Sequence, residues 1–346
     1  MLRTELLQEG GKDSFKNIKT ELFKKKSILI TGASGIVGTH FIYGLKYLKE
    51  VLEIDLNIIA IVNRGIPEHF VPLLDKNYIT FFTGDLTNAS FLNTLPEADY
   101  IIHAATYGQP GKFMEFPEIT IKLNTTVTIF LLEKRLKQNG KFLFISSSEV
   151  YSGLPLPPYN ESQIGTTTPN HSRACYIEAK RCGEAITSIF KQKGVSAVSA
   201  RLSLAYGPGT KSDDRRVLNN FIEKALINKE IKLMDSGSAK RTYCYVSDAV
   251  NMMWKILLDG TQDVYNIGGI SSITIFELAN LIGKITNVPV IKPNEMSDGI
   301  SGAPEDVRLD LSRFNKEFGE LNFYDIQKGL ERTVAWQTSM FLNKNK

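Results

Sequence analysis

Cysteine is scarce in this chain of 346 residues, which contains only Cys175, Cys182 and Cys244. An odd and sparse set argues against a disulfide framework and is typical of a reducing compartment. The chain also lacks pairs of histidine and cysteine at metal-ligand spacing, so we expect no metal site. No apolar run approaches the length of a membrane span, and residues 1–26 are charged rather than signal-like. These absences predict a cytoplasmic protein with no membrane partner.

Excess charge of one sign is lacking as well. The 41 basic residues exceed the 37 acidic residues by four, and the basic residues are dispersed apart from residues 24–26. So small a net charge does not indicate a nucleic-acid partner, and it is compatible with an anionic small substrate. Apolar residues make up 42% of the chain and charged residues 23%, as in ordinary soluble globular proteins. The length allows one large domain or two modest ones.

Strand-like and helix-like segments alternate between residues 27 and 201. Helical patterns lie between apolar strands, notably at 36–48, 117–138 and 175–192. This alternation predicts an α/β fold, a Rossmann-type doubly wound parallel sheet that is covered on both faces. The predicted strands occupy residues 27–31, 56–62, 79–82, 100–102, 141–146 and 196–201.

Two further parts flank this predicted dinucleotide-binding domain, residues 27–201. Residues 1–26 form an N-terminal extension, in which the 15–23 segment has the pattern of a short amphipathic helix. After residue 201 the pattern becomes less regular. We interpret 202–346 as mostly a smaller C-terminal substrate-binding lobe, partly interleaved with the first domain.

A glycine-rich motif, residues 31–38, follows the first predicted strand and precedes a predicted helix. Gly32, Gly35 and Gly38 recur every three residues, which allows a tight turn and a close approach of backbone to a pyrophosphate. The N–H groups of Ile36 and Val37, at the start of the helix, can then bind that anion. The alternative is a tight strand-to-helix turn without a ligand.

Tyr176 and Lys180 stand downstream of the motif at the spacing Y-x-x-x-K. They share one face of the predicted helix 175–192, because they are one helical turn apart. A lysine ammonium beside a phenol, with a nicotinamide cation near it, lowers the phenol pKa. Tyrosinate can then take a proton from a substrate hydroxyl while hydride leaves the same carbon. The alternative is a half-buried tyrosine beside a solvated lysine.

Polar residues follow three more of the predicted strands. A hydroxyl at Ser146 or Ser147 is suited to bond the substrate hydroxyl, and Glu149 is suited to act as a base, an acid or a sugar clamp. Their alternatives are strand-end capping and a solvated loop carboxylate. Asp85 is suited to accept from an adenine amino group, or else to cap the helix that follows it. His103 is expected to be structural.

Together these motifs resemble the extended short-chain dehydrogenase/reductase family of nucleotide-sugar epimerases, dehydratases and decarboxylases. The resemblance covers roughly residues 27–335, nearly the whole chain. The motifs are TGASGIVG at 31–38, the Asp85 turn, HAAT at 103–106, SSSEVY at 146–151, YIEAK at 176–180, AYGPG at 205–209 and YVSD at 245–248.

Within that family the chain looks most like the UDP-glucuronate decarboxylases. The stretch 172–181 (SRACYIEAKR) is similar to their PRACYDEGKR, and 213–221 (DDRRVLNNF) is similar to their NDGRVVSNF. Residues 147–151 (SSEVY) resemble TSEVY, and 114–125 contains the start of a helix of the form P-x-x-T-x-x-x-N. The resemblance implies a lyase or isomerase with bound NAD and a UDP-sugar substrate. It also implies a homodimer paired through helices 117–138 and 175–192, which are rich in Ile, Leu and Phe; the alternative is that these apolar stripes pack on the sheet.

The resemblance implies that NAD oxidises the sugar C4 hydroxyl while Tyr176 acts as base and Lys180 keeps it anionic. Carbon dioxide then leaves from C6, C5 is protonated and the hydride returns to C4. Ser147 and Glu149 flank the reacting sugar. The implied cofactor-binding residues are Gly32, Gly35, Ile36, Val37, Gly38, Asn63, Arg64, Asp85, Leu86, Ala104, Ala105, Thr106, Asn124, Tyr176 and Lys180, and the implied substrate-binding residues are Ser148, Arg216, Asn220, Arg241 and Arg308.

Two departures from the family pattern bear on these implications. After the second strand the family usually has Asp, whereas this chain has Asn63 and Arg64, and an arginine there can accommodate the 2′-phosphate of NADP. Leu204 replaces the Asn that commonly touches substrate in the motif R-x-F-N-x-Y-G-P. The alternative functions are a nucleotide-sugar 4,6-dehydratase, a 4-epimerase or ketoreductase, and a cofactor-binding sensor on the same fold.

Overall fold

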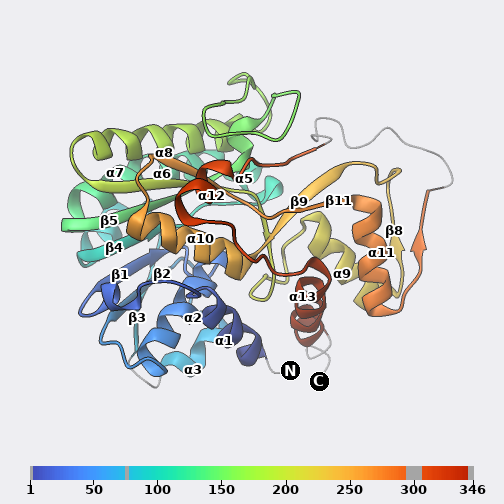
Figure 1. Cartoon of the computed structure of the whole chain (residues 1–346), viewed down its shortest axis with the longest axis horizontal. Coiled ribbons are helices and arrows are strands. Elements are labelled where there is room, and N and C mark those ends of the chain that lie inside the picture. The colour runs from blue at the N-terminus through green and yellow to red at the C-terminus, as the bar shows by residue number, and fades with distance from the viewer. Residues whose placement is uncertain (1–2, 75–77, 294–305, 342–346) are drawn as a thin grey trace.

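A seven-stranded parallel sheet forms the centre of the computed structural model, which describes residues 3–74, 78–293 and 306–341 (Figure 1). The strand order is β10-β6-β5-β4-β1-β2-β3. The chain therefore adds β2 and β3 on one side of β1 and then crosses back to add β4, β5, β6 and β10 on the other side. The predicted Rossmann-type, doubly wound fold is confirmed. The strands are β1 (Ser27–Thr31), β2 (Asn57–Val62), β3 (Ile79–Thr83), β4 (Ala98–His103), β5 (Leu136–Ser147), β6 (Ser196–Leu202) and β10 (Val264–Ile267).

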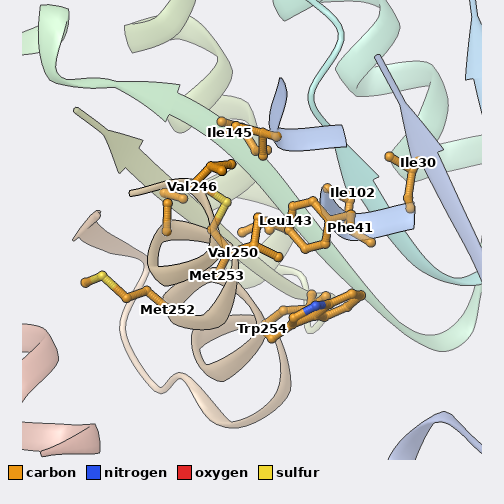
Figure 2. Close-up of a cluster of buried hydrophobic side chains, with 14 of the residues drawn as sticks. Ile30, Phe41, Ile102, Leu143, Ile145, Val246, Val250, Met252, Met253 and Trp254 are labelled. Atoms are coloured by element: carbon orange, nitrogen blue, oxygen red, sulfur yellow. The ribbon is translucent and has the colours of Figure 1, made fainter. Parts of the chain in front are cut away.

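Helices cover both faces of the sheet because side chains along each strand alternate between the faces. Ile30 packs with α2 (Ile36–Glu50) and α10 (Val246–Asp259), where Trp254 is fully buried (Figure 2). Its neighbour Leu29 packs on the opposite face with residues of α7 (Thr126–Lys134) and α8 (Ala174–Gln192). No helix in the described ranges is both long and apolar enough to cross a membrane.

The C-terminal lobe has a hydrophobic core of its own, beside the sheet in Figure 1. Helix α10 and strand β10 follow part of this lobe in sequence and return to the large sheet, so the two halves of the chain interleave. The lobe contains β7 (Leu204–Tyr206), β8 (Ile231–Lys232), β9 (Lys240–Tyr245), β11 (Ser271–Thr274), β12 (Val290–Ile291), α9 (Val217–Asn228), α11 (Ile275–Thr286) and α13 (Ile326–Phe341). Shorter helices elsewhere are α3 (Val71–Leu74), α4 (Ala89–Thr94), α5 (Pro110–Glu115) and α12 (Ser312–Phe318).

The predicted helix at 15–23 is wrong. The N-terminal helix is α1 (Arg3–Asp13), and only a short 3₁₀ turn, η1 (Thr20–Phe23), lies within the predicted segment. The backbone at Asn17 has a φ of 57°, which no right-handed helix contains. Phe15 and Phe23 both pack on Trp254, with ring centroids 5.4 and 5.0 Å away. Their apolar spacing therefore reflects burial against α10 and not a helical face.

The single helix predicted at 117–138 is also wrong. Two helices, α6 (Pro117–Asn124) and α7 (Thr126–Lys134), are separated at Thr125, whose φ of −117° and ψ of −78° depart from helical values. After Lys134 the chain enters β5, and Leu136 pairs with Ala98 of β4. Tertiary pairing at the sheet thus overrides the helical pattern of the last residues.

Close packing of α1 on α2 predicts the effect of a substitution at Gly11. A Cβ atom there would lie 2.5 Å from the carbonyl carbon of Tyr43, which is backbone and cannot swing aside. We expect Gly11→Ala to lower the free energy of unfolding by about 1–3 kcal/mol, the usual cost of overpacking. The control is Gly111→Ala in α5, where the new methyl group meets open space. Equal stability of the two variants in urea denaturation would contradict this packing.

Candidate active site

The glycine-rich turn lies at the carboxyl end of β1, where dinucleotides bind in doubly wound sheets. Gly32 has a φ of +65°, and a Cβ on it would lie 2.8 Å from the Ala104 carbonyl. A Cβ on Gly38 would lie 2.4 Å from the Gly32 carbonyl oxygen. No side chain caps α2 at Gly35, so backbone N–H groups at its start face the turn. Side chains at Gly32 and Gly38 would push this backbone apart, so the glycines keep the tight strand-to-helix turn that suits a pyrophosphate.

Polar contacts fix the neighbouring strand end beside this turn. His103 is buried, its Nδ1 lies 2.7 Å from Thr31 Oγ1 and its Nε2 lies 2.8 Å from the Leu123 carbonyl oxygen. Burial lowers the His103 pKa to about 4, so the ring is neutral and structural. The Ala105 N–H donates to Thr31 Oγ1, and Asn124 Nδ2 donates to Thr106 Oγ1 at 2.9 Å. The structure thus brings residues 104–106 and Asn124 to the turn.

Other predicted cofactor residues follow β2 and β3. Asn63 and Arg64 are exposed at the end of β2, beside the glycine-rich turn. Asp85 accepts hydrogen bonds from the Thr87 N–H and hydroxyl at 2.8 and 2.9 Å. Asn88, not Asp85, caps α4, so the alternative of a helix-capping Asp85 is wrong. Leu86 is buried.

Tyr176 is buried at the start of α8, and its ring stacks on Phe113 with centroids 4.6 Å apart. Burial raises the pKa of Tyr176 to about 12, the Ser147 hydroxyl opposes this shift and the Glu149 carboxylate adds to it. Arg216 and Arg173 also lower the phenol pKa. The structure therefore brings Tyr176, Ser147 and Glu149 together.

Lys180 lies beneath Tyr176, where its Nζ donates to the Ile145 carbonyl oxygen at 2.5 Å. Burial lowers the Lys180 pKa to about 7, with partial compensation from Glu184. Burial dominates at Tyr176 and raises its pKa, so the expected depression of that pKa is not found in the protein without a dinucleotide. The buried lysine is close enough to serve the tyrosine, because its Nζ is 5.7 Å from the centroid of the phenol ring.

Of the two candidate serines, Ser147 faces the site. Ser146 Oγ instead donates to Glu184 Oε1 at 2.5 Å, and Glu184 is paired with Arg201 at 2.8 Å. Ser146 therefore belongs to a buried structural network. Ser147 caps the short 3₁₀ turn η3 (Ser148–Tyr151) by accepting from the Glu149 N–H at 3.2 Å.

An ion pair between Glu149 and Arg173 is the main feature of the site that sequence reasoning missed. Arg173 Nη2 donates to Glu149 Oε1, and both side chains are about three-quarters buried, with 22% and 25% of their surface exposed. The guanidinium also lies over the Phe113 ring, 5.8 Å from its centroid. The signal was present in the stretch 172–181, in which Arg173 stands three residues before Tyr176.

The predicted substrate arginines are placed differently from one another. Arg216, at the start of α9, donates hydrogen bonds from Nε and Nη2 to the buried Asp214 carboxylate and lies near enough to Tyr176 to lower its pKa. Arg241 lies within electrostatic reach of Glu149 and Arg173. These arginines give the site a cationic wall suited to an anionic substrate.

Arg308 and Asn220 are less directly connected to the site. Arg308 Nε donates to Asp306 at 2.8 Å and its side chain is 44% exposed. Asp306 in turn acts electrostatically on Arg241. Asn220 lies in the first turn of α9, where its N–H donates to the Arg216 carbonyl. Within the described residues, no contact joins Arg308 or Asn220 to Tyr176.

Comparison with known proteins places this arrangement in a family. The family model described as the NAD dependent epimerase/dehydratase family matches residues 28–268. The chain belongs to this family. Its members are NAD-dependent, and the glycine-rich turn described above fits that dinucleotide.

Relatives of known activity include several UDP-glucuronic acid decarboxylases. UDP-glucuronic acid decarboxylase 1 of Xenopus tropicalis is 30% identical over 318 residues, which cover 90% of this chain and 72% of the relative. UDP-glucuronic acid decarboxylase 6 of Arabidopsis thaliana is 27% identical over 310 residues, covering 88% and 86%. The protein is therefore a member of an enzyme family whose relatives include nucleotide-sugar epimerases, dehydratases and decarboxylases.

Solved structures share the fold. The UDP-glucose 4-epimerase of Thermotoga maritima with UDP-glucose has a TM-score of 0.75 and 24% identity, covering 91% of this chain and 99% of that one. The UDP-glucuronic acid 4-epimerase of Bacillus cereus, in complex with UDP-glucuronic acid and NAD, has a TM-score of 0.74 and 21% identity, covering 91% and 100%. At this identity the likeness establishes the architecture.

The position of Tyr176 predicts the effect of removing its hydroxyl. Tyr176→Phe keeps the stacking on Phe113 but removes the proton acceptor, so turnover of a nucleotide-sugar substrate should fall by at least about 10²-fold. Dinucleotide binding, measured by calorimetry, should change little. The control is Tyr47→Phe, which removes a hydroxyl near the end of α2. Substantial turnover by Tyr176→Phe would contradict the assigned role.

The lowered pKa of Lys180 predicts a pH-dependent stability. The unfolded chain keeps a proton on this lysine up to about its ordinary pKa of 10.5, whereas the folded protein, in which the pKa is about 7, releases it near pH 7. The unfolded state therefore binds more protons in this window, and the free energy of unfolding should rise with pH from about 7, by up to about 1.4 kcal/mol per pH unit.

Urea denaturation at pH 7, 8 and 9 measures this contribution. Lys180→Met should lose the increment, while Lys284→Met, at an exposed position of α11, should follow the unsubstituted protein. Parallel pH profiles for Lys180→Met and the unsubstituted protein would show that this buried lysine does not titrate in the window.

Proposed function

We propose that the protein is a UDP-glucuronate decarboxylase that forms UDP-xylose with a recycled nicotinamide cofactor. The observation that carries this proposal is the ion-paired Glu149 beside Tyr176 and Ser147, surrounded by Arg173, Arg216 and Arg241. A substrate with a diphosphate and a sugar carboxylate provides the negative charge for which such a wall is suited. The similarity to UDP-glucuronic acid decarboxylases supports the same substrate.

The chemistry follows from what each side chain can do. The glycine-rich turn would hold the dinucleotide, and its nicotinamide would supply a reversible hydride acceptor for sugar C4. Tyr176 takes the proton of the sugar C4 hydroxyl, which Ser147 holds by a hydrogen bond. Because the phenol is neutral in the protein alone, its deprotonation depends on positive charge. Lys180, Arg216 and Arg173 are the cations placed to supply it.

Loss of carbon dioxide requires no base at C5. A ketone at C4 lies beta to the C6 carboxylate, so the C5–C6 bond electrons pass into an enolate as carbon dioxide leaves. Protonation at C5 and return of the hydride to C4 complete the reaction. A 4,6-dehydratase instead needs a carboxylate to remove the C5 proton. Glu149 already accepts a hydrogen bond from Arg173, which favours a positioning role over proton abstraction.

The proposal is tested with UDP-glucuronate labelled at C6, incubated with the protein and NAD, beside a panel of UDP-, GDP-, CDP- and dTDP-sugars. We expect labelled carbon dioxide and UDP-xylose, with no net accumulation of NADH because the hydride is returned. Water loss or inversion at C4 would assign the dehydratase or epimerase instead. A cofactor-binding sensor would turn over none of the panel. UDP-glucuronate that is recovered unchanged would refute the decarboxylase.

Glu149→Gln separates the two lyase chemistries. In a decarboxylase this variant should retain some carbon dioxide release, at roughly 10–10³-fold lower rate, because positioning and protonation are impaired but bond cleavage is not. A dehydratase should stop after oxidation with NADH trapped, which is visible in the absorbance spectrum. The control is Glu331→Gln on α13, an exposed carboxylate outside the site.

We further propose that the protein is a homodimer paired through α6, α7 and α8. Ile121, Ile129 and Ile189 lie on these helices with 44%, 37% and 48% of their surface exposed. A second copy of the same face would bury such side chains in a four-helix interface. Light scattering at micromolar concentration should give twice the chain mass. Ile189→Glu should weaken the dimer, and Ile270→Glu, on a loop of the other lobe, should not. A monomer would contradict this assembly.

A further inference from the structure

Two cations meet beside the glycine-rich turn, at the place where the ribose of the adenosine half of a dinucleotide lies in this fold. The Ala33 N–H donates to the Ile61 carbonyl at 3.2 Å, so the end of β2 adjoins the turn. Arg64 follows that strand and is exposed, and no acidic residue stands at positions 63–65. An acid there would bond the 2′-hydroxyl of NAD, whereas an arginine there is suited to the 2′-phosphate of NADP.

The second cation comes from a distant part of the chain. Lys211 Nζ donates to the hydroxyl of Ser34, in the glycine-rich turn, at 3.3 Å. Lys211 is also within electrostatic reach of Arg64. Desolvation lowers the Lys211 pKa, Asp213 opposes that shift and Arg64 adds to it, as expected for two cations within electrostatic reach of each other.

Buried contacts fix the backbone that carries Lys211. The preceding residue, Thr210, is buried, its hydroxyl donates to the Gly207 carbonyl at 2.9 Å, and its carbonyl accepts from Trp336 Nε1 at 2.8 Å. At Gly209, with a φ of +91°, a Cβ would already lie 3.5 Å from a methyl carbon of Thr39 on α2. The backbone at Lys211 is therefore held by packing on α2 and α13, although the side chain itself is exposed.

The two cations are not neutralised by an ion pair. Among the described residues, no carboxylate lies within salt-bridge distance of Arg64 or Lys211, whereas the nearby Arg215 and Arg216 are each paired with an acid. The space next to Arg64 is also open, because a Cβ on Gly65 would meet nothing within 4 Å. Two neighbouring cations, a hydroxyl and open space make a site for a dianionic phosphate.

We propose that Arg64, Lys211 and Ser34 bind the 2′-phosphate of NADP, so that this chain binds NADP at least as tightly as NAD. The inference rests on the dinucleotide site of the proposed function and adds to it a subsite for one phosphate. Transient oxidation and reduction at the sugar proceed equally with either dinucleotide, because the 2′-phosphate is remote from the nicotinamide. The difference lies in binding.

Isothermal titration calorimetry of the full chain with NAD and with NADP tests this inference. For the unsubstituted protein we expect a dissociation constant for NADP no higher than that for NAD. Arg64→Gln and Lys211→Gln should each weaken NADP binding about tenfold or more relative to NAD. Added salt should reduce the NADP affinity more steeply than the NAD affinity, because one more charged contact is screened. Lys284→Gln, which removes one exposed positive charge from α11, is the matched control.

Each other outcome has a distinct meaning. NAD binding at least tenfold tighter than NADP binding would overturn the 2′-phosphate subsite and leave the proposed decarboxylase standing. An equal loss of both dinucleotides in Arg64→Gln and Lys211→Gln would also overturn it, because those side chains would then contact a group common to both ligands. Failure of the folded protein to bind either dinucleotide would contradict the dinucleotide site itself, and the proposed function with it.

Discussion

Helix α8 lies so close to strand β5 that residue 183 has no room for a side chain. A Cβ on Gly183 would lie 2.2 Å from the ring of Phe144, and Phe144 is fully buried and cannot swing aside. This contact fixes the height and the rotation of α8 over the sheet. Lys180, one turn before Gly183, then reaches the Ile145 carbonyl, and Tyr176, one turn earlier still, stands at the carboxyl end of β5.

Arginine side chains surround that tyrosine and act on its pKa. Burial disfavours tyrosinate, and Arg216 and Arg173, two of the three cations around the site, oppose this effect of burial. Arg173 arrives just before α8, Arg216 at the start of α9, and Arg241 in β9 of the C-terminal lobe. The interleaving of the two halves is what brings these charges to one sheet edge. A substrate that binds between them adds its own negative charge, so recognition and the chemistry of the phenol are linked.

The sequence was sufficient to predict six of the seven strands of the sheet, because strand burial and the Gly-rich turn are local signals, but it missed β10, which returns to the sheet from the C-terminal lobe. It also indicated the pairing of Tyr176 with Lys180 and the choice of the family. It failed where tertiary contacts decide: residues 15–23 are spaced for packing on Trp254, and the helix at 117–138 is interrupted at Thr125 before the chain joins β5. The Glu149–Arg173 ion pair joins residues 24 positions apart across two elements, and Lys211 reaches Ser34 across 177 positions. No spacing rule pairs residues at such separations, so the folded structure was needed to show which side chains meet.

The central claim is that sugar C4 is oxidised and reduced again at one site while carbon dioxide leaves from C6. Turnover of UDP-glucuronate in deuterium oxide tests this most directly, with the product analysed by nuclear magnetic resonance. The account predicts one solvent deuterium at C5 of UDP-xylose and the original hydrogen at C4, because the hydride returns to the carbon it left. A product with solvent deuterium at C4, or without deuterium at C5, would contradict it.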